Sequence, residues 1–345
     1  MNYRFNDLTK EQLKNALKDM GEKPYRGNQI FENIHKNHWM KFDEMTNLSK
    51  NLREKLTEYG EIQKDRIYRV FSSKEDGTKK FLIELKDLNI VEAVYMEYEN
   101  RNTICISSQV GCRMGCSFCA STKAGFIRNL KAYEMLNQIY LVSESVGKRI
   151  SNLVIMGIGE PLDNYDEILK FIEILGDKDG YNMSIRRMTL STCGIVPKIY
   201  DLAERGIPIN LTISLHNPFD EERREIMPIT KRYSVEDIIK ACEYFYQKTG
   251  RRVSYEYTLI HEINDKEKHI DELVRLFHHQ NIHINLIPLN PIAEFGGKSS
   301  NTKEIEDFSK KLKARGIHTT IRKSQGRDIE SACGQLRRDN KEVMS

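Results

Sequence analysis

The sequence predicts an α/β protein built on a partial (β/α)6, TIM-like barrel, with a small N-terminal helical domain and a β-hairpin extension. Three observations predict this class. Residues 1–60 carry apolar side chains at helical spacing. Residues 61–98 change to strand-like runs around a turn signal. From about residue 99, short apolar runs alternate with helical stretches, and this alternation implies parallel strands joined by crossover helices.

The N-terminal domain, residues 1–60, begins with a clear helix start signal. Thr9 and Gln12 fit a capping box, in which each side chain satisfies a backbone N–H of the first turn. Gly21 and Pro24 separate this helix from the next one. The apolar positions at helical spacing are Leu13, Ala16, Leu17, Met20, Ile30, Ile34, Leu48, Leu52 and Leu56. We expect a small helical accessory domain.

Residues 61–98 predict a β-rich linker or extension. The segment Glu75–Gly77 lies between the runs YRVF and FLIEL, and Asp-Gly between two apolar runs is a strong hairpin signal. The later run VEAVYMEY predicts a further strand.

The barrel itself is expected over residues 99–318. Its strand candidates are TICIS, NLVIMGIGE, RMTLSTCG, INLTISLHN, VSYEYTLI and INLIPLNP, and HTTIRK leads into residues 319–345 as a C-terminal strand and basic segment. Helices are expected near residues 133–147, 163–175, 197–205, 234–249, 265–280 and 302–315. Four strand candidates end in polar or special residues, namely Gly159-Glu160-Pro161, Ser191-Thr192, Ser214-Leu215-His216 and Asn290-Pro291. Because the C-terminal strand ends of a barrel build its active site, we expect the functional site there.

Composition narrows the function classes. The chain has 345 residues, a net charge of +4 and seven cysteines, an odd number that does not suit a disulfide framework. No run approaches the roughly 18 apolar residues of a membrane span, and the opening MNYRFNDLTK lacks the apolar core of a signal peptide. We therefore expect a cytoplasmic protein. Between Lys310 and Lys341, ten Lys/Arg stand against three Asp/Glu, which suits either a nucleic acid surface or a solvated basic tail.

The strongest motif is the C-x3-C-x2-C run formed by Cys112, Cys116 and Cys119. Three thiolates on one loop can hold a cubane iron–sulfur cluster, and the fourth iron then remains open to a chelating ligand. Gly111 and Gly115 allow the backbone to approach the cluster closely. A structural zinc site would require four closed ligands, and the sequence has no second C-x2-C pair to supply them.

This spacing is that of the radical S-adenosylmethionine (SAM) superfamily, so the barrel is expected to be a radical SAM barrel. Beyond the cysteines, the chain strongly resembles the RlmN/Cfr family of RNA adenosine methyltransferases over nearly its whole length. The stretches that carry the resemblance are 105–112, 118–122, 125–130, 156–162, 191–197, 214–216, 320–322, 326–329 and 332–336.

The resemblance implies a [4Fe-4S] cluster, SAM and a methylated cysteine intermediate. Cys333 matches the family's methyl-carrying cysteine, and Cys105 matches the cysteine that resolves the RNA adduct by forming a transient disulfide bond. Glu92 matches the proposed general base, although a lone glutamate at a strand start is more often solvated. Cys193 and Cys242 match no such role and are interpreted as packing residues.

The resemblance also implies which residues contact SAM. These are Gly159, Glu160, Ser191, Ser214, Leu215, His216 and Asn290. The basic residues expected to hold RNA phosphates around the Cys333 segment are Arg322, Lys323, Arg327, Arg337 and Arg338.

The preferred hypothesis is methylation of C2 of an adenosine in 23S ribosomal RNA at the peptidyl transferase centre, with transfer RNA as a second substrate. The alternative is Cfr-type methylation of C8 of the same adenosine, which confers antibiotic resistance. Pro161 favours the first, because Cfr-like sequences tend to carry alanine there. Two further alternatives are an iron–sulfur RNA-binding module without chemistry and a cluster-dependent dithiol redox protein.

The expected partners follow from this hypothesis. They are 23S ribosomal RNA, transfer RNA and a low-potential electron donor such as flavodoxin or ferredoxin. We expect a monomer that does not bind a membrane.

Overall fold

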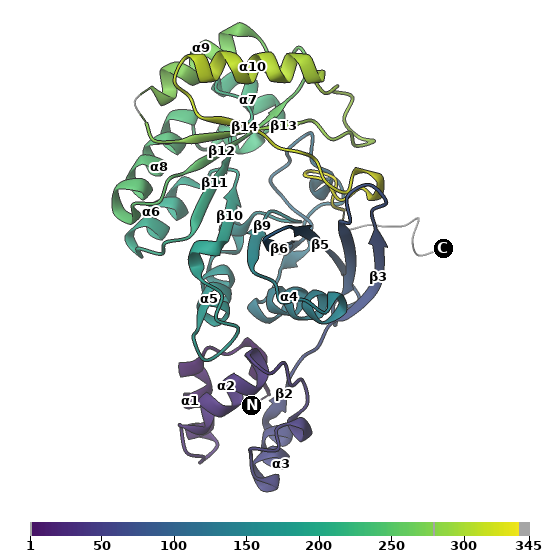
Figure 1. The fold of residues 1–345 in the computed structure, drawn as a ribbon. Coiled ribbons are helices and arrows are strands. Elements are labelled where there is room, and N and C mark those ends of the chain that lie inside the picture. The colour runs from purple at the N-terminus through teal and green to yellow at the C-terminus, as the bar shows by residue number, and fades with distance from the viewer. Residues whose placement is uncertain (1, 279, 338–345) are drawn as a thin grey trace.

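A computed structural model describes residues 2–278 and 280–337 of the chain, and a ten-stranded mixed sheet organises it. Along the sheet the strand order is β14-β13-β12-β11-β10-β9-β6-β5-β4-β3. The helices of the barrel cover the outside of the parallel half, and the N-terminal helices form a separate lobe below it (Figure 1). No helix in the described ranges is long and apolar enough to cross a bilayer.

The N-terminal lobe is helical, as predicted, and its first helix carries the expected capping box. Thr9 Oγ1 accepts the Gln12 N–H at 3.3 Å, and Gln12 Oε1 accepts the Thr9 N–H at 2.9 Å. The lobe contains α1 (Lys10–Asp19), α2 (Arg26–His35) and α3 (Lys50–Tyr59), together with the short parallel strands β1 (Tyr3–Arg4) and β2 (Gly60–Glu61), which the sequence pattern did not reveal. Its apolar positions join the main hydrophobic core.

The predicted hairpin is confirmed, and it continues the barrel sheet. Its strands are β3 (Arg66–Ser72) and β4 (Lys79–Glu84), followed by β5 (Ile90–Tyr98) and β6 (Arg101–Cys105). These four strands pair antiparallel in sequence order. Strand β6 then pairs parallel with β9 (Asn152–Ile155), so it joins the antiparallel half of the sheet to the parallel half.

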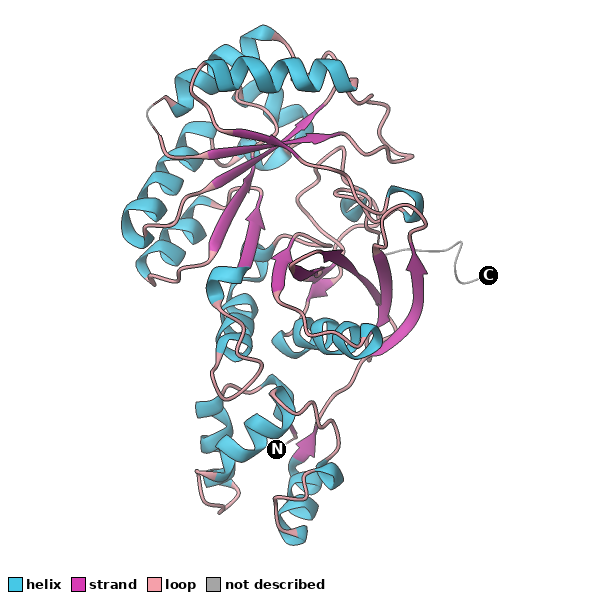
Figure 2. Cartoon of the chain, viewed as in Figure 1, coloured by secondary structure: helices cyan, strands magenta, loops and turns pink. Residues whose placement is uncertain are grey.

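The predicted alternation of strands and helices is confirmed from β6 onward. Each crossover places a helix outside the sheet, as Figure 2 shows. The further parallel strands are β10 (Met188–Thr192), β11 (Asn210–Ser214), β12 (Ser254–Leu259), β13 (His283–Pro288) and β14 (Thr319–Ile321). The helices are α4 (Ala132–Val146), α5 (Tyr165–Gly176), α6 (Val196–Glu204), α7 (Asp220–Ile226), α8 (Val235–Thr249), α9 (Glu267–Phe277) and α10 (Thr302–Ala314).

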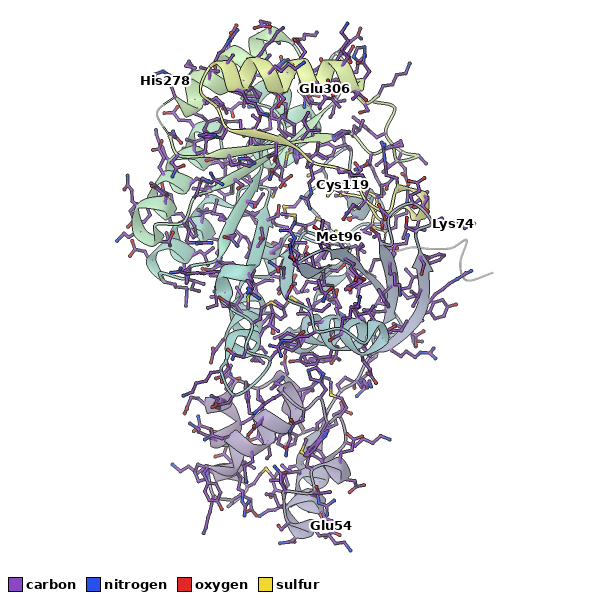
Figure 3. All side chains as sticks on the ribbon, viewed as in Figure 1. Glu54, Lys74, Met96, Cys119, His278 and Glu306 are labelled. Carbon is purple, nitrogen blue, oxygen red and sulfur yellow. The ribbon has the colours of Figure 1, made fainter. Side chains whose placement is uncertain are left out.

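The sheet does not close into a full barrel, because its edge strands β3 and β14 do not pair with each other. Cys119 and Met96 are labelled between the two halves of the sheet in Figure 3, where a cavity opens. A glycine lets the chain cross this region. A Cβ at Gly157 would lie 2.7 Å from the backbone carbon of Ile106, so only glycine fits where the end of β9 passes the end of β6.

We expect Gly157→Ala to lower the free energy of unfolding by about 1–3 kcal/mol, because the added methyl group meets backbone that has no room to move. Urea unfolding of the apoprotein measures this change. Gly296→Ala is the matched control, since a Cβ there has no neighbour within 4 Å. Equal effects of the two substitutions would contradict the steric account.

A second prediction concerns Asp65, which lies between the N-terminal lobe and the sheet. Its Oδ2 accepts a hydrogen bond from Asn137 Nδ2 at 2.9 Å, whereas its buried Oδ1 has no partner. Burial raises the pKa of this carboxyl group to about 7. The folded state therefore holds a proton that the unfolded chain releases near pH 4, so stability falls as the pH rises from about 4 to about 7.

Asp65→Asn should flatten this part of the stability profile, which has a slope of at most about 1.4 kcal/mol per pH unit. Unfolding of both proteins at pH 5 and pH 8 tests it, with the exposed Asp43→Asn as control. An unchanged slope in Asp65→Asn would show that other groups cause the pH dependence.

Candidate active site

Two adjoining cavities lie at the C-terminal ends of the parallel strands. The first, of about 150 Å³, is lined by the three motif cysteines and by the ends of β9, β10, β11 and β13. The second, of about 540 Å³, lies between the antiparallel strands and the C-terminal segment. Asn290, Arg322 and Cys333 line both cavities. The first cavity is therefore the place at which the sequence predicts a cofactor site.

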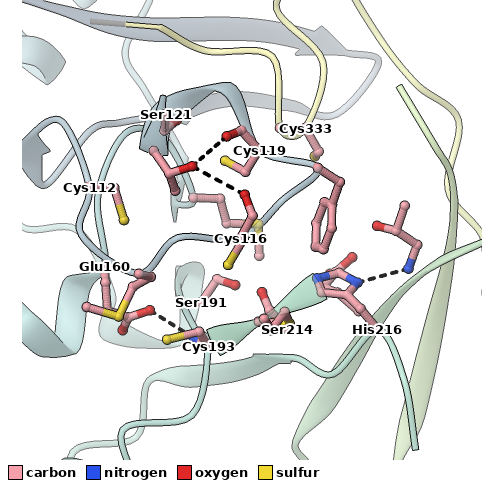
Figure 4. A pocket seen from close by; sticks show the side chains of 18 of the residues that line it. Cys112, Cys116, Cys119, Ser121, Glu160, Ser191, Cys193, Ser214, His216 and Cys333 are labelled. Carbon is pink, nitrogen blue, oxygen red and sulfur yellow. Dashed lines mark hydrogen bonds between the residues drawn. The ribbon is translucent and has the colours of Figure 1, made fainter. Parts of the chain in front are cut away.

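The motif cysteines lie on a loop that is bent by glycines. Gly111 has a φ of 77°, and a Cβ there would lie 1.8 Å from the Gly125 carbonyl oxygen, so no other residue fits. Thr122 Oγ1 donates to the Cys119 carbonyl at 3.0 Å and can likewise reach the Cys116 carbonyl at 3.2 Å. These contacts hold the loop in place, with its sulfur atoms toward the first cavity (Figure 4).

The spacing of the sulfur atoms fits a cluster better than a single ion. The Sγ atoms of Cys112, Cys116 and Cys119 do not all lie within 4.8 Å of one another. Three thiolates on one zinc ion would lie closer, because each Zn–S bond is about 2.3 Å long. Burial raises the pKa of Cys112 to about 12, so the thiolate form requires a cationic partner at the loop. Three thiols that line one cavity therefore fit a three-cysteine iron–sulfur cluster.

Opposite the cysteines, Glu160 and Gly159 occupy the end of β9. Glu160 Oε1 accepts the Leu162 N–H at 3.0 Å, and Oε2 accepts the Cys193 N–H at 2.8 Å. Burial raises the pKa of Glu160, while these hydrogen bonds oppose the shift. Each oxygen keeps a lone pair that can accept from an ammonium group. Gly159 has a φ of 114°, and a Cβ there would lie 2.8 Å from the Gln109 backbone nitrogen.

Strands β10 and β11 add polar groups to the same wall. Ser191, Ser214 and His216 line the cavity beside the cysteines (Figure 4). His216 Nδ1 accepts the Thr258 N–H at 2.9 Å, so the remaining ring nitrogen carries the proton of the neutral imidazole. Burial lowers the pKa of His216 to about 3, which keeps the ring neutral. Leu215 instead packs in the main hydrophobic core with no exposed surface.

The C-terminal segment closes over the cavities. Cys333 is exposed, and its carbonyl accepts a hydrogen bond from Asn290 Nδ2 at 3.1 Å. The segment is also bound to the cluster loop, because Ala120 N–H donates to the Gly334 carbonyl at 2.7 Å and Ser121 Oγ donates to the Leu336 carbonyl at 2.8 Å. The structure thus brings Cys333 next to the loop at residues 112–119.

Cys105 lies at the end of β6 and lines the second cavity together with Cys333. Burial raises the pKa of Cys105 to about 12, and the Arg322 guanidinium opposes this shift. All seven cysteines are free, so the structure contains no disulfide bond. A resident disulfide bond is therefore not supported, and the transient one implied by the resemblance stays a prediction.

Glu92, the expected general base, lies outside both cavities and is buried rather than solvated. It has no exposed surface, Lys80 Nζ lies 3.5 Å from its Oε1, and the Arg337 N–H donates to its Oε2 at 2.9 Å. Glu92 therefore connects the central strand β5 to the segment that follows Cys333.

The basic residues near Cys333 do not form one free surface. Arg322 lines both cavities and lies 3.5 Å from Glu256 Oε1, and Arg337 forms an ion pair with Glu294 at 2.6 Å. Arg338 lies outside the described residues. Phosphate binding by Arg322, Lys323, Arg327, Arg337 and Arg338 stays a prediction.

Sequence analysis missed several residues of the site. Cys193, interpreted there as a packing residue, lines the first cavity, and so does Glu256, whose carboxyl group is buried. Arg322, expected there to hold an RNA phosphate, lines the cavity as well and is partly exposed. The buried Glu256 Oε2 and Asn290 Oδ1 have no hydrogen-bond partner. A glutamate in the middle of an otherwise apolar strand candidate, VSYEYTLI, was the available signal for Glu256.

Comparison with known families agrees with this geometry. The sequence model of the Radical SAM superfamily matches residues 106–277, which include the cysteine loop and the parallel strands β9 to β12. A solved radical SAM methyltransferase from Sphaerobacter thermophilus superposes with a TM-score of 0.92 at 39% identity, covering 97% of this chain and 99% of that one. Fold and site thus define a radical SAM protein.

The N-terminal lobe and the whole-chain relatives narrow the assignment. Residues 4–62 match the ribosomal RNA large subunit methyltransferase N-terminal domain. The probable dual-specificity RNA methyltransferase RlmN of Finegoldia magna is 52% identical over 334 residues, covering 97% of this chain and 96% of that protein. The corresponding protein of Lachnoclostridium phytofermentans is 52% identical over 332 residues, covering 96% and 93%. This chain belongs to the RlmN family.

Replacing Cys112, Cys116 or Cys119 by alanine should abolish cluster assembly, because each thiolate supplies one iron ligand. The wild-type protein, reconstituted without oxygen, should hold about four irons per chain. Iron analysis and the brown absorption band measure the change. Cys242→Ala, at a core position of α8, is the matched control. A full iron complement in any one of the three variants would remove that cysteine from the cluster.

Proposed function

We propose that this chain methylates C2 of an adenosine in 23S ribosomal RNA at the peptidyl transferase centre, and an adenosine in transfer RNA, with Cys333 as methyl carrier. The observation that carries the proposal is the cavity that Cys105, Cys119 and Cys333 share. The relatives' printed name, dual-specificity RNA methyltransferase, supports RNA as the substrate class and two RNA targets.

The electronic character of adenine explains why the transfer needs radical chemistry and a carrier on the protein. C2 is electron-poor, so it does not attack the methyl group of a sulfonium as a nucleophile. A bound cluster and SAM would supply radical chemistry here. The chain's own part is to hold the transferred carbon on the sulfur of Cys333 and to present it to the base. Exposure of Cys333 at the cavity edge supports this part.

Cys105 is the residue that releases the product. Its thiolate attacks the Cys333 sulfur, a disulfide bond forms and the bond from sulfur to the transferred carbon breaks. The electron pair of the broken bond stays with that carbon, which takes up a proton to become the methyl group of the product. An external dithiol then reduces the disulfide. Arg322, whose charge opposes the high pKa of Cys105, favours the thiolate needed for this attack.

Glu92 is the proposed base for the proton lost from the adenine ring. It accepts the N–H of Arg337, four residues after Cys333, which supports a place beside the carrier segment. Lys80, 3.5 Å away, stabilises the carboxylate form. A rearrangement of the carrier segment on RNA binding would have to expose Glu92, because it has no exposed surface in this structure.

Seven of the side chains discussed are proposed to hold the cofactors. Cys112, Cys116 and Cys119 would bind a [4Fe-4S] cluster, and Glu160, Ser191, Ser214 and His216 would bind SAM. A low-potential donor of the flavodoxin or ferredoxin class would supply the electron.

The alternative, Cfr-type methylation at C8, differs in the position of the methyl group. Pro161 begins a short 3-10 helix that Glu160 caps, so the residue that favours C2 chemistry adjoins the proposed SAM ligand. Chromatography of digested RNA against 2-methyladenosine and 8-methyladenosine standards distinguishes the two, because the isomers have equal mass.

Cys333→Ala should abolish methyl transfer and leave the iron content unchanged, because only the carrier is lost. Cys105→Ala should instead accumulate protein covalently bound to RNA, since the adduct forms but is not resolved. A nuclease-sensitive band shift on a denaturing gel measures this species.

The matched control is Cys242→Ala, which should neither accumulate the adduct nor lose activity. The double variant Cys105→Ala/Cys333→Ala should show no band shift. If Cys105→Ala stays free of RNA and methylates at the wild-type rate, the two-cysteine mechanism is wrong.

A further inference from the structure

Arg223 of α7 is a fully buried cation without a carboxylate partner among the described residues. Its side chain has no exposed surface, and no Asp or Glu oxygen lies within 4.0 Å. The guanidinium is nevertheless well hydrogen-bonded. Nε donates to the Leu215 carbonyl at 2.9 Å, Nη1 to Thr230 Oγ1 at 2.7 Å, and Nη2 to the carbonyls of Cys193 at 2.8 Å and Ser214 at 3.0 Å.

Hydrogen bonds to neutral groups do not cancel the cost of burying a charge. An isolated ion in a protein interior loses several kcal/mol of hydration, and buried charges are therefore paired or bound to a metal centre. Arginine cannot escape this cost by releasing its proton, because its pKa stays far above physiological pH. Arg223 therefore requires a nearby negative charge.

The position of Arg223 indicates where this negative charge is. Two of its carbonyl partners, on Cys193 and Ser214, belong to residues that line the first cavity. The end of α7 also contacts the cluster loop, because the Ser117 N–H donates to the Ile226 carbonyl at 2.9 Å and Cys116 packs against the apolar cluster that contains Cys193 and Ile226. Arg223 thus lies behind the ends of β10 and β11, on a helix that contacts the loop of the three motif cysteines.

We propose that Arg223 is the counter-ion of the iron–sulfur cluster bound by Cys112, Cys116 and Cys119, and that its fixed charge raises the reduction potential of that cluster. The proposal rests on the cluster assignment made above. Reduction adds one electron from a low-potential protein donor, makes no new bond and increases the negative charge at the loop by one. A cation held behind the loop favours the reduced state, because the low-dielectric wall screens it little.

A purely structural role makes a different prediction. Arg223 also ties together the ends of β10 and β11, so its loss could move the cavity wall without any electrostatic effect. The two roles separate if charge and hydrogen bonding are changed independently. Arg223→Lys keeps the charge and loses most of the hydrogen bonds, whereas Arg223→Gln loses both.

Thr230 allows the charge to be cancelled while the guanidinium stays. Its hydroxyl lies 2.7 Å from Nη1 in a buried position. Thr230→Asp places a carboxylate against Arg223, and Thr230→Asn is a neutral control of the same shape. This pair keeps the test intact even if Arg223→Gln does not fold.

The experiment is a redox titration of the anaerobically reconstituted proteins, followed by the electron paramagnetic resonance signal of the reduced cluster. Arg223→Gln and Thr230→Asp should each lower the ratio of reduced to oxidised cluster about tenfold at a fixed potential. For a one-electron couple this is a negative shift of about 59 mV. Arg223→Lys and Thr230→Asn should stay close to the wild type.

Two results would overturn the proposal. One is an unchanged midpoint potential in both Arg223→Gln and Thr230→Asp at full iron content. The other is an equal shift in Thr230→Asn and Thr230→Asp, which would indicate a change of shape rather than of charge. Failure of the cluster assignment itself would look different, because the wild type would then hold fewer than about four irons.

Discussion

The double pairing of β6 sets the position of Cys105 and of the loop that carries Cys112, Cys116 and Cys119. Cys105, the last residue of this strand, pairs with Val94 in antiparallel β5 and with Val154 in parallel β9. Hydrogen bonds on both edges leave the strand no freedom of register, because a one-residue slip would turn its buried side chains to the wrong face. The loop that carries Cys112 starts a few residues later, so its origin is fixed as well.

The two halves of the sheet meet again through the C-terminal segment. Asn290 at the end of β13 holds the Cys333 carbonyl, and Ala120 beside the cluster loop holds the Gly334 carbonyl. From the other side, the hairpin turn contributes Asp76, whose Oδ2 accepts the Gly326 N–H at 2.9 Å. The hairpin therefore not only extends the sheet but also anchors the segment that brings Cys333 to the cavity.

The sequence predicted the parts of the fold and site that have local signals. The hairpin around Glu75–Gly77, the Thr9 capping box and the strand ends that carry Glu160 and His216 are all coded within a few residues. Leu215 was assigned to the site by the family resemblance, together with its neighbours Ser214 and His216. Successive side chains of a strand point to opposite faces, and this rule accounts for its place in the core.

Charges buried by distant segments could not be predicted in the same way. Arg223 sits in the acidic and basic run DEERREI, which is typical of an exposed helix face, and only the packing of α7 behind β10 and β11 buries it. Glu92 is likewise buried by distant segments, because Lys80 and Arg337 approach it from two other parts of the chain. Such burial depends on tertiary contacts that no short sequence window contains.

The contacts between the hairpin and the carrier segment affect both the order of folding and the local opening of the protein. The contacts Asp76–Gly326 and Ser73–Asp328 join residues that are 250 and 255 positions apart. Closing so long a loop is slow, so these contacts form after the sheet has assembled. They are few and mostly solvent-exposed, which places them among the least protected parts of the molecule. The contact between the hairpin turn and residues 326–328 can therefore open and close as a local unit while the sheet beneath it stays folded.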